Sequence, residues 1–381
     1  MTTKTWTAIN QDLIGLADGA SRVTTPALML DLPSLQKNIA VMVQQCAKAG
    51  LGLRPHAKTH KSPHIANLQI AAGAAGVCCA TPHEAIAMAQ SGVQHILVTS
   101  PIIQPRHFER LANLHRQGTD LMVVIDHPRQ IEQWRNALVG QKPLPALVDI
   151  DIGMGRTGVR SEDDAVAIAR ALADSNAFLY KGVQAYSGMV QHINDYDERR
   201  ATYGRQLDVL ERTIAALGKN GLEPGIISGG GTGTFAIDVE RGLYTETQVG
   251  SYIFMDVEYN EVELFRDRSN PYLTSLFLRT TVLNANVSGQ VTINAGFKCL
   301  ATDGPLAHVM APGPKGYSYQ LYGDEYGRIV IADGAPRPDV GSFVDLMTPH
   351  CDPTVNLHDC YHIIEGDRLV DIWPIAARGV L

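Results

Sequence analysis

The chain has 381 residues, of which 45% are hydrophobic and 19% charged, which suits one large domain or two ordinary ones. Its formal net charge is −7 and no stretch concentrates lysine and arginine, so nucleic acids and anionic membranes are poor partner candidates. The N-terminal segment has no apolar signal-peptide core, the most apolar run (68–80) is too short to span a bilayer, and six cysteines without a CxxC motif are typical of reduced thiols, so a cytoplasmic protein is expected.

An alternation of strand and helix patterns runs through the first two thirds of the chain. A short apolar run at 27–31 and a helical pattern at 35–49 come first. Eight apolar, β-branched runs follow, and these are 51–56, 77–80, 95–99, 121–126, 146–152, 180–186, 224–228 and 247–254. Helical patterns separate them, several of which end at glycine. Eight strands joined by helices predict a (β/α)8 barrel, although an open doubly wound sheet would show the same alternation.

The pattern changes after about Arg266, where helical periodicity almost disappears. Short runs with β character follow, separated by glycine and aspartate turns, and these predict a second, β-rich domain. We therefore expect an α/β chain with a (β/α)8 barrel at 27–262 and a β-rich domain formed by 1–26 and 263–381.

The segment RPHAKTHKS (54–62) ends the first predicted barrel strand with three cations and two histidines. Active sites of such barrels lie at the carboxyl ends of the strands, so Lys58 is expected to point into the barrel mouth. Partial desolvation and neighbouring positive charges would lower its pKa and favour an amine nucleophile able to form a Schiff base. A solvated basic loop is the alternative.

A glycine-rich segment, ISGGGTGTF (227–235), follows the seventh predicted strand. Glycines allow backbone N–H groups to approach a phosphate closely, and the Thr232 hydroxyl adds a donor. No GK[ST] follows, so the segment is not a P-loop. The phosphate site of many barrels lies after strands seven and eight, where this segment and Gly250-Ser251-Tyr252 fall. A tight turn without a ligand is the alternative.

Two further strand ends carry polar side chains. DIDIGMGRTGV (149–159) presents Arg156, which could face a ring oxygen or a carboxylate, or could pair with a neighbouring aspartate. QAYSGMVQH (184–192) ends the sixth strand with Tyr186 and His192. His192 is a candidate general base, with a structural hydrogen-bonding role as the alternative.

In the predicted β-rich domain, TPHCDPT (348–354) carries a histidine and an aspartate two residues apart. In an extended segment His350 and Asp352 would face the same way and could chelate a metal, with Cys351 pointing the opposite way. A nitrogen and oxygen ligand pair favours Mn²⁺, Mg²⁺ or Zn²⁺ over purely soft metals. Such pairs are common by chance, so a turn before Pro353 is the alternative.

Taken together, these segments resemble the fold-type III pyridoxal-phosphate enzymes of the D-threonine aldolase and D-serine dehydratase group, over nearly the whole chain. RPHAKTHK is the most specific element and resembles the cofactor-lysine motif of that group, with Lys58 as the Schiff-base lysine. The resemblance implies an alanine-racemase-like barrel and a head-to-tail homodimer with the active site at its interface. The expected contacts of pyridoxal 5'-phosphate besides Lys58 are Arg156, Tyr186 (at the pyridine nitrogen), Gly230, Thr232, Gly250 and Ser251, and the expected metal ligands are His350 and Asp352.

The resemblance implies an aldolase more than a dehydratase, because the dehydratase branch carries a His-x-Cys pair where this chain has Asp352. The expected reaction is the pyridoxal-phosphate- and metal-dependent cleavage of a D-3-hydroxy amino acid (of the D-threonine, D-allo-threonine or D-phenylserine type) to glycine and an aldehyde. Mn²⁺ is the first metal candidate, and either His192 or a metal-activated water takes the hydroxyl proton. A dehydratase of the D-serine or D-threo-3-hydroxyaspartate type, an amino-acid racemase and a non-catalytic cofactor carrier are the alternatives.

Overall fold

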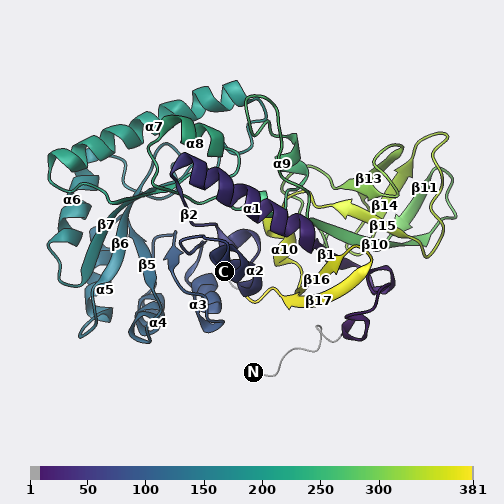
Figure 1. Ribbon diagram of the computed structural model, residues 1–381, viewed down its shortest axis with the longest axis horizontal. Coiled ribbons are helices and arrows are strands. Elements are labelled where there is room, and N and C mark those ends of the chain that lie inside the picture. The colour runs from purple at the N-terminus through teal and green to yellow at the C-terminus, as the bar shows by residue number, and fades with distance from the viewer. Residues whose placement is uncertain (1–8, 380–381) are drawn as a thin grey trace.

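The computed structural model describes residues 9–379, and its strands form two sheets (Figure 1). One is an eight-stranded parallel sheet in the order β2-β9-β8-β7-β6-β5-β4-β3. Its strands are β2 (Gly52–Leu53), β3 (Val77–Cys79), β4 (Ile96–Val98), β5 (Leu121–Ile125), β6 (Leu144–Ile150), β7 (Phe178–Ala185), β8 (Ile226–Gly229) and β9 (Glu246–Thr247). A bridge between His56, just after β2, and Cys78 in β3 closes the sheet. The predicted (β/α)8 barrel is confirmed.

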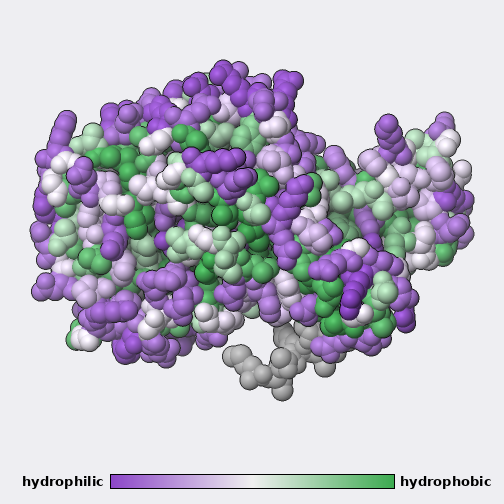
Figure 2. All heavy atoms as spheres, in the orientation of Figure 1, coloured by the Kyte–Doolittle hydropathy of each residue, from purple (hydrophilic) through white to green (hydrophobic). Residues whose placement is uncertain are grey.

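Helices connect successive barrel strands and cover the outside of the barrel. They are α2 (Pro63–Ala71), α3 (Pro82–Gln90), α4 (Pro105–Arg116), α5 (Pro128–Ala137), α6 (Glu162–Ala173), α7 (Tyr196–Lys219) and α8 (Phe235–Arg241). Each of α2 to α5 begins with proline, whose missing N–H is not needed in a first helical turn. Polar side chains cover the outer edge that α7 forms (Figure 2). Across residues 9–379, none of the helices combines the length and the apolar character that crossing a lipid bilayer requires.

Strand alternation divides the apolar side chains of the barrel into two sets, because neighbouring residues of a strand face opposite ways. One set packs against the helices in a large cluster around Trp134. The other set, Cys78, Leu97, Val124 and Leu147, forms a separate buried cluster from four neighbouring strands. The barrel interior is therefore a packed core, and a ligand has room only at its ends.

A second sheet of nine strands forms the β-rich domain. Its strands are β1 (Ala27–Asp31), β10 (Leu276–Asn284), β11 (Gln290–Ile293), β12 (His308–Ala311), β13 (Tyr317–Leu321), β14 (Gly327–Ile331), β15 (Phe343–Met347), β16 (Cys360–Glu365) and β17 (Arg368–Pro374). β1 pairs antiparallel with β10 and parallel with β16. Residues 27–31, which the sequence analysis placed at the start of the barrel domain, thus belong to this sheet. Residues 1–8 of the predicted β-rich domain lie outside the described range.

The two domains share an apolar core where the chain leaves the barrel. The helices α1 (Leu32–Ala49) and α10 (Cys351–Asn356) contribute to it, together with the segment after β9 that leads into α9 (Val257–Glu261). The Asn38 amide of α1 donates to the backbone carbonyls of Ile253 (3.0 Å) and Leu273 (2.7 Å). This shared core holds α9 and α10 between the barrel and the second sheet (Figure 1).

Candidate active site

A pocket of about 370 Å³ opens at the carboxyl ends of the barrel strands. Lys58 follows β2, Arg156 follows β6 and Tyr186 follows β7, and all three side chains line this pocket. The structure therefore brings together three predicted cofactor residues that are up to 128 positions apart (from 58 to 186). They meet on the face of the barrel where active sites are built.

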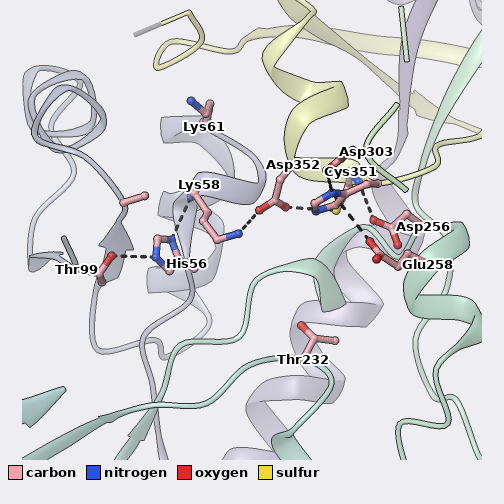
Figure 3. Close-up of polar contacts among 12 residues, drawn as sticks. His56, Lys58, Lys61, Thr99, Thr232, Asp256, Glu258, Asp303, Cys351 and Asp352 are labelled. Atoms are coloured by element: carbon pink, nitrogen blue, oxygen red, sulfur yellow. Dashed lines mark hydrogen bonds and ion pairs between the residues drawn. The ribbon is translucent and has the colours of Figure 1, made fainter. Parts of the chain in front are cut away.

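Lys58 lies in the short 3₁₀ helix Ala57–Thr59, and its ammonium contacts the carboxylate of Asp352 (Figure 3). Burial lowers the pKa of Lys58, but the charge and hydrogen bond of Asp352, together with the neighbouring Tyr186, outweigh burial and raise the pKa above its ordinary value. The predicted lowering of this pKa is therefore wrong here, because it considered only the cations that are close in sequence. For Asp352, burial alone would raise the pKa, but the charges of Lys58 and His350 hold the pKa of this carboxyl below its usual range.

Beside Lys58, His56 is held in one tautomer. Its Nδ1 accepts the backbone N–H of Lys58 (3.4 Å), and its Nε2 lies 3.1 Å from Thr99 Oγ1. The Thr99 hydroxyl donates to the carbonyl of Cys79 (3.1 Å), so its oxygen is left to accept the Nε2–H of His56. Burial and then the charge of Lys58 lower the pKa of His56 to about 3, which keeps the ring neutral. These bonds fix the loop that carries Lys58.

Arg156 and Tyr186 lie together in the pocket wall. The guanidinium carbon of Arg156 is 5.9 Å from the centroid of the Tyr186 ring. The neighbouring Asp151 instead accepts from Arg160 (3.0 Å) and from the backbone N–H of Gly155 (3.0 Å). This pairing leaves the Arg156 guanidinium to face the pocket, where it can meet an oxygen of a ligand.

The two predicted phosphate segments lie against each other. Thr232 Oγ1 accepts the backbone N–H of Tyr252 (3.1 Å), which joins the loop after β8 to the 3₁₀ helix Ser251–Ile253 after β9. A Cβ on Gly250 would lie 2.5 Å from Thr59 Oγ1, so only glycine lets this loop approach the lysine segment so closely. The segments expected to bind phosphate are therefore neighbours of each other and of the lysine.

Packing alone also explains one of these glycines. Gly230 has a φ of 70°, and a Cβ there would lie 2.3 Å from Asp238 Oδ2, so a tight turn requires glycine at this position without any ligand. The fit to an anion is better beside it, where the buried Thr247 hydroxyl has no hydrogen-bond partner in the described part of the chain. An orphaned donor next to glycine-rich backbone fits a phosphate group.

His350 and Asp352 lie at the start of α10 in the β-rich domain, and Asp352 points toward Lys58 of the barrel (Figure 3). His350 is the extended N-cap residue (φ −135°, ψ 123°), whereas Asp352 lies in the first helical turn. The predicted extended segment through both residues is therefore wrong, because the Asp256 carboxylate accepts the Cys351 N–H (2.7 Å) and begins a helix there. Cys351 is buried, and its thiol lies 3.5 Å from Asp352 Oδ1.

His192 lies beside His350, at the position expected of a base that acts on a substrate bound to the metal. Its ring centroid is 6.2 Å from that of His350 and 5.1 Å from that of Tyr259. Burial, followed by the positive charges of His350 and Lys58, lowers the pKa of His192 to about 4. The ring is therefore neutral near pH 7, which is the state that can accept a proton.

Three acidic residues at this junction were not predicted from the sequence, namely Asp256, Glu258 and Asp303. Asp303 Oδ2 lies 2.8 Å from Nδ1 of His350, and Glu258 Oε1 lies 3.1 Å from Nδ1 of His192. The run DVE (256–258) after the last barrel strand marks a helix start and carries no sign of a site, and Asp303 lies in a loop of the other domain. Asp303 and Glu258 are each far in sequence from the histidine beside them, so the contacts form only in the folded protein.

The residues at the junction fit a divalent metal with two protein ligands. Because Asp303 engages Nδ1 of His350, Nε2 is left as the ligand atom, an arrangement common for metal-binding histidines. Asp352 adds carboxylate oxygens. Within residues 9–379, no three His, Cys, Asp or Glu side chains are grouped to hold a metal by themselves. Water or substrate would therefore complete the coordination, as in an open catalytic site.

Comparison with known proteins finds relatives of this chain over nearly its whole length. Residues 30–258 match the family model described as alanine racemase, N-terminal domain, and residues 275–364 match that described as a putative serine dehydratase domain. The chain is 35% identical to D-threonine aldolase of Arthrobacter sp. over 364 residues (95% of this chain, 94% of that protein). It is 34% identical to 3-hydroxy-D-aspartate aldolase of Paracoccus denitrificans over 366 residues (94% and 93%). The crystal structure of D-threonine aldolase from Filomicrobium marinum matches with a TM-score of 0.89 at 36% identity (94% and 97%).

Proposed function

The chain belongs to the alanine-racemase-like family that contains D-threonine aldolase and 3-hydroxy-D-aspartate aldolase, and on this premise we propose that it cleaves D-3-hydroxy amino acids of the D-threonine type to glycine and an aldehyde, using pyridoxal phosphate and a divalent metal. Its membership makes it a carbon–carbon lyase. The observation that carries the proposal is the approach of Lys58 of the barrel to Asp352 of the β-rich domain, with His192 and His350 beside them.

Two groups from outside the chain complete this chemistry. When bound, pyridoxal phosphate would supply an electron sink for the cleaved bond, and a divalent metal would supply a Lewis acid toward the β-oxygen of the substrate. His350 and Asp352 would hold the metal, with Mn²⁺ preferred to Mg²⁺ or Zn²⁺. Lys58 would hold the cofactor covalently. The cofactor ring and phosphate would be bound by Arg156, Tyr186, Gly230, Thr232, Gly250 and Ser251.

Whether the substrate is cleaved or dehydrated depends on which of its protons a base removes, that of the β-hydroxyl or that of Cα. Carbon–carbon cleavage needs the β-oxygen as an anion, whereas dehydration needs it as a leaving group. His192 is neutral, lies beside the metal pair and would take the proton of the β-hydroxyl at Nε2. Asp352 in place of the cysteine expected of a dehydratase also favours the aldolase reaction.

Product analysis tests this function. Purified protein incubated with pyridoxal phosphate, Mn²⁺ and D-threonine is expected to release acetaldehyde and glycine in equal amounts, measured by a coupled aldehyde assay and amino-acid chromatography. L-threonine is the matched control and should not react. A 2-oxoacid and ammonia without aldehyde would assign the chain to the dehydratase alternative, and interconversion of D- and L-alanine would assign it to a racemase.

Thr232 is expected to contribute a hydrogen bond to the cofactor phosphate. Its oxygen already accepts the Tyr252 N–H, so its hydroxyl proton is left to donate. Thr232→Ala should weaken cofactor binding by about 1.5–3 kcal/mol, the value of a bond to a charged group. Titration of cofactor-free protein by absorbance measures this change, and Thr232→Ser, which keeps the hydroxyl, should bind nearly as the parent does. Equal affinity in the alanine variant would place the phosphate elsewhere.

Two broader proposals accompany this function. We propose a homodimer with the active site at the subunit interface and a cytoplasmic location. Both rest on family resemblance and on composition, and both stay predictions.

A further inference from the structure

Glu258 lies between the two histidines of the site and has no part in the reaction proposed above. Its Oε1 is 3.1 Å from Nδ1 of His192, and its Oε2 is 4.0 Å from Nδ1 of His350. His350 has a closer partner, because Asp303 lies 2.8 Å from the same Nδ1. The Glu258 carboxylate is therefore closer to His192 than to His350, and the nearest acidic partner of His350 is Asp303.

The backbone holds Glu258 in a fixed position relative to the metal pair. Asp256 caps two helices at once, since its carboxylate accepts the Tyr259 N–H of α9 (2.9 Å) and the Cys351 N–H of α10 (2.7 Å). The Val257 N–H donates to the carbonyl of Thr348 (3.0 Å), two residues before His350. The start of α9 is thus tied to the start of α10, and Glu258 moves with the residues that would bind the metal.

His192 needs an acceptor at Nδ1 if its Nε2 is to work as a base. A neutral imidazole carries one proton, so a basic Nε2 requires the proton on Nδ1. Nδ1 of His192 is buried, and no well-aligned hydrogen bond reaches it within the described residues. The Glu258 carboxylate lies within hydrogen-bonding distance of this nitrogen (3.1 Å), and a rotation of the imidazole ring would align the two groups.

We propose that Glu258 is a positioning residue: its carboxylate accepts the Nδ1–H of His192, which fixes the tautomer and turns Nε2 toward the hydroxyl group of the substrate. The inference rests on the proposed function, because that function assigns the proton transfer to His192. Glu258 itself touches neither the substrate nor the reacting atoms.

Kinetics of the loaded enzyme provide the first test. Glu258→Ala is expected to lower kcat for D-threonine about 100-fold, which is within the contribution of a general base, with little change in KM. Glu258→Gln should lose less, because its amide oxygen can still accept from Nδ1. The matched control is Glu261→Gln, an exposed residue of the same short helix, which should leave kcat unchanged. Affinity for Mn²⁺ and the absorbance of bound cofactor should stay as in the parent in all three variants.

Nitrogen NMR of the protein labelled with ¹⁵N-histidine provides a readout that a structural role would not move. In the holoenzyme with Mg²⁺ in place of paramagnetic Mn²⁺, His192 should be protonated at Nδ1 and unprotonated at Nε2. The His192→Gln spectrum identifies its signals. In Glu258→Ala the pattern should change to a mixture of tautomers or to the reverse tautomer.

The outcomes separate this inference from the function on which it rests. If His192→Gln keeps full kcat, the assigned base is wrong and the role of Glu258 falls with it. If His192→Gln is inactive but Glu258→Ala keeps full kcat or the parent tautomer, the inference about Glu258 alone is overturned. A loss of Mn²⁺ affinity that accounts for the lost kcat would also overturn it, since Glu258 would then act through His350. If the parent does not cleave D-threonine, the function fails, while the NMR result still decides whether Glu258 sets the tautomer.

Discussion

Replacing Lys58 by alanine is expected to remove both the visible absorbance of bound pyridoxal phosphate and all measurable cleavage of D-threonine. The amine of Lys58 lies in the pocket and can bond covalently with the aldehyde of the cofactor. Lys58→Arg is the matched variant, because it keeps a positive charge beside Asp352 while its guanidinium stays protonated and cannot form that bond. Absorbance spectra of each protein, recorded after incubation with cofactor and desalting, measure the effect.

Stability must be measured beside activity in these two variants. Lys58→Ala leaves the Asp352 carboxylate without its partner, and the Asp352 side chain is only 13% exposed. A buried charge that loses its partner costs about 3–5 kcal/mol, and the partial exposure of the pair reduces this. Lys58→Arg should therefore melt closer to the parent than Lys58→Ala does. A folded Lys58→Ala protein that still shows the cofactor band would overturn the assignment of Lys58.

The barrel could be predicted because its signal is local and repeated. Each strand and the helix after it show their own periodicity, and eight repeats distinguish a closed barrel from shorter alternations. Element ends were less accurate. The run 247–254 was expected to be one strand, but it contains the end of the two-residue β9 and the 3₁₀ helix Ser251–Ile253. A short buried apolar run has the same sequence pattern in a strand and in a helix, so the sequence alone does not show where the strand ends and the helical turn begins.

Contacts between distant segments could not be predicted in the same way. The apolar run of β1 predicts a strand, but its partners β10 and β16 belong to the last third of the chain. No local sequence pattern indicates which strands pair with it. The pKa of Lys58 was predicted from the cations beside it in sequence, whereas Asp352 is its partner in space. Glu258 was missed for the same reason, because it is 66 residues from His192 in sequence and the two side chains meet only in the folded protein.

Removal of the metal is expected to abolish cleavage while the fold and the bound cofactor remain. His350 and Asp352 offer two protein ligands, fewer than the four of a closed structural zinc site, so the domain does not depend on the metal for its core. The Asp256 carboxylate, not a metal, begins α10 by capping the Cys351 N–H. Protein treated with EDTA and desalted should therefore keep its circular dichroism spectrum and its cofactor absorbance, and added Mn²⁺ should restore cleavage.

Asp352→Ala should be inactive as well, but it alters two groups at once. It removes a metal ligand, and it also removes the charge that raises the pKa of Lys58, so that pKa should fall as burial then prevails. Asp352→Asn keeps the shape and an amide oxygen, so excess Mn²⁺ should restore part of its cleavage if the loss is one of metal binding. Activity that Mn²⁺ does not restore, with the cofactor band weakened, would assign the loss to Lys58 instead. Full cleavage by parent protein that contains no metal by elemental analysis would show that His350 and Asp352 only begin a helix.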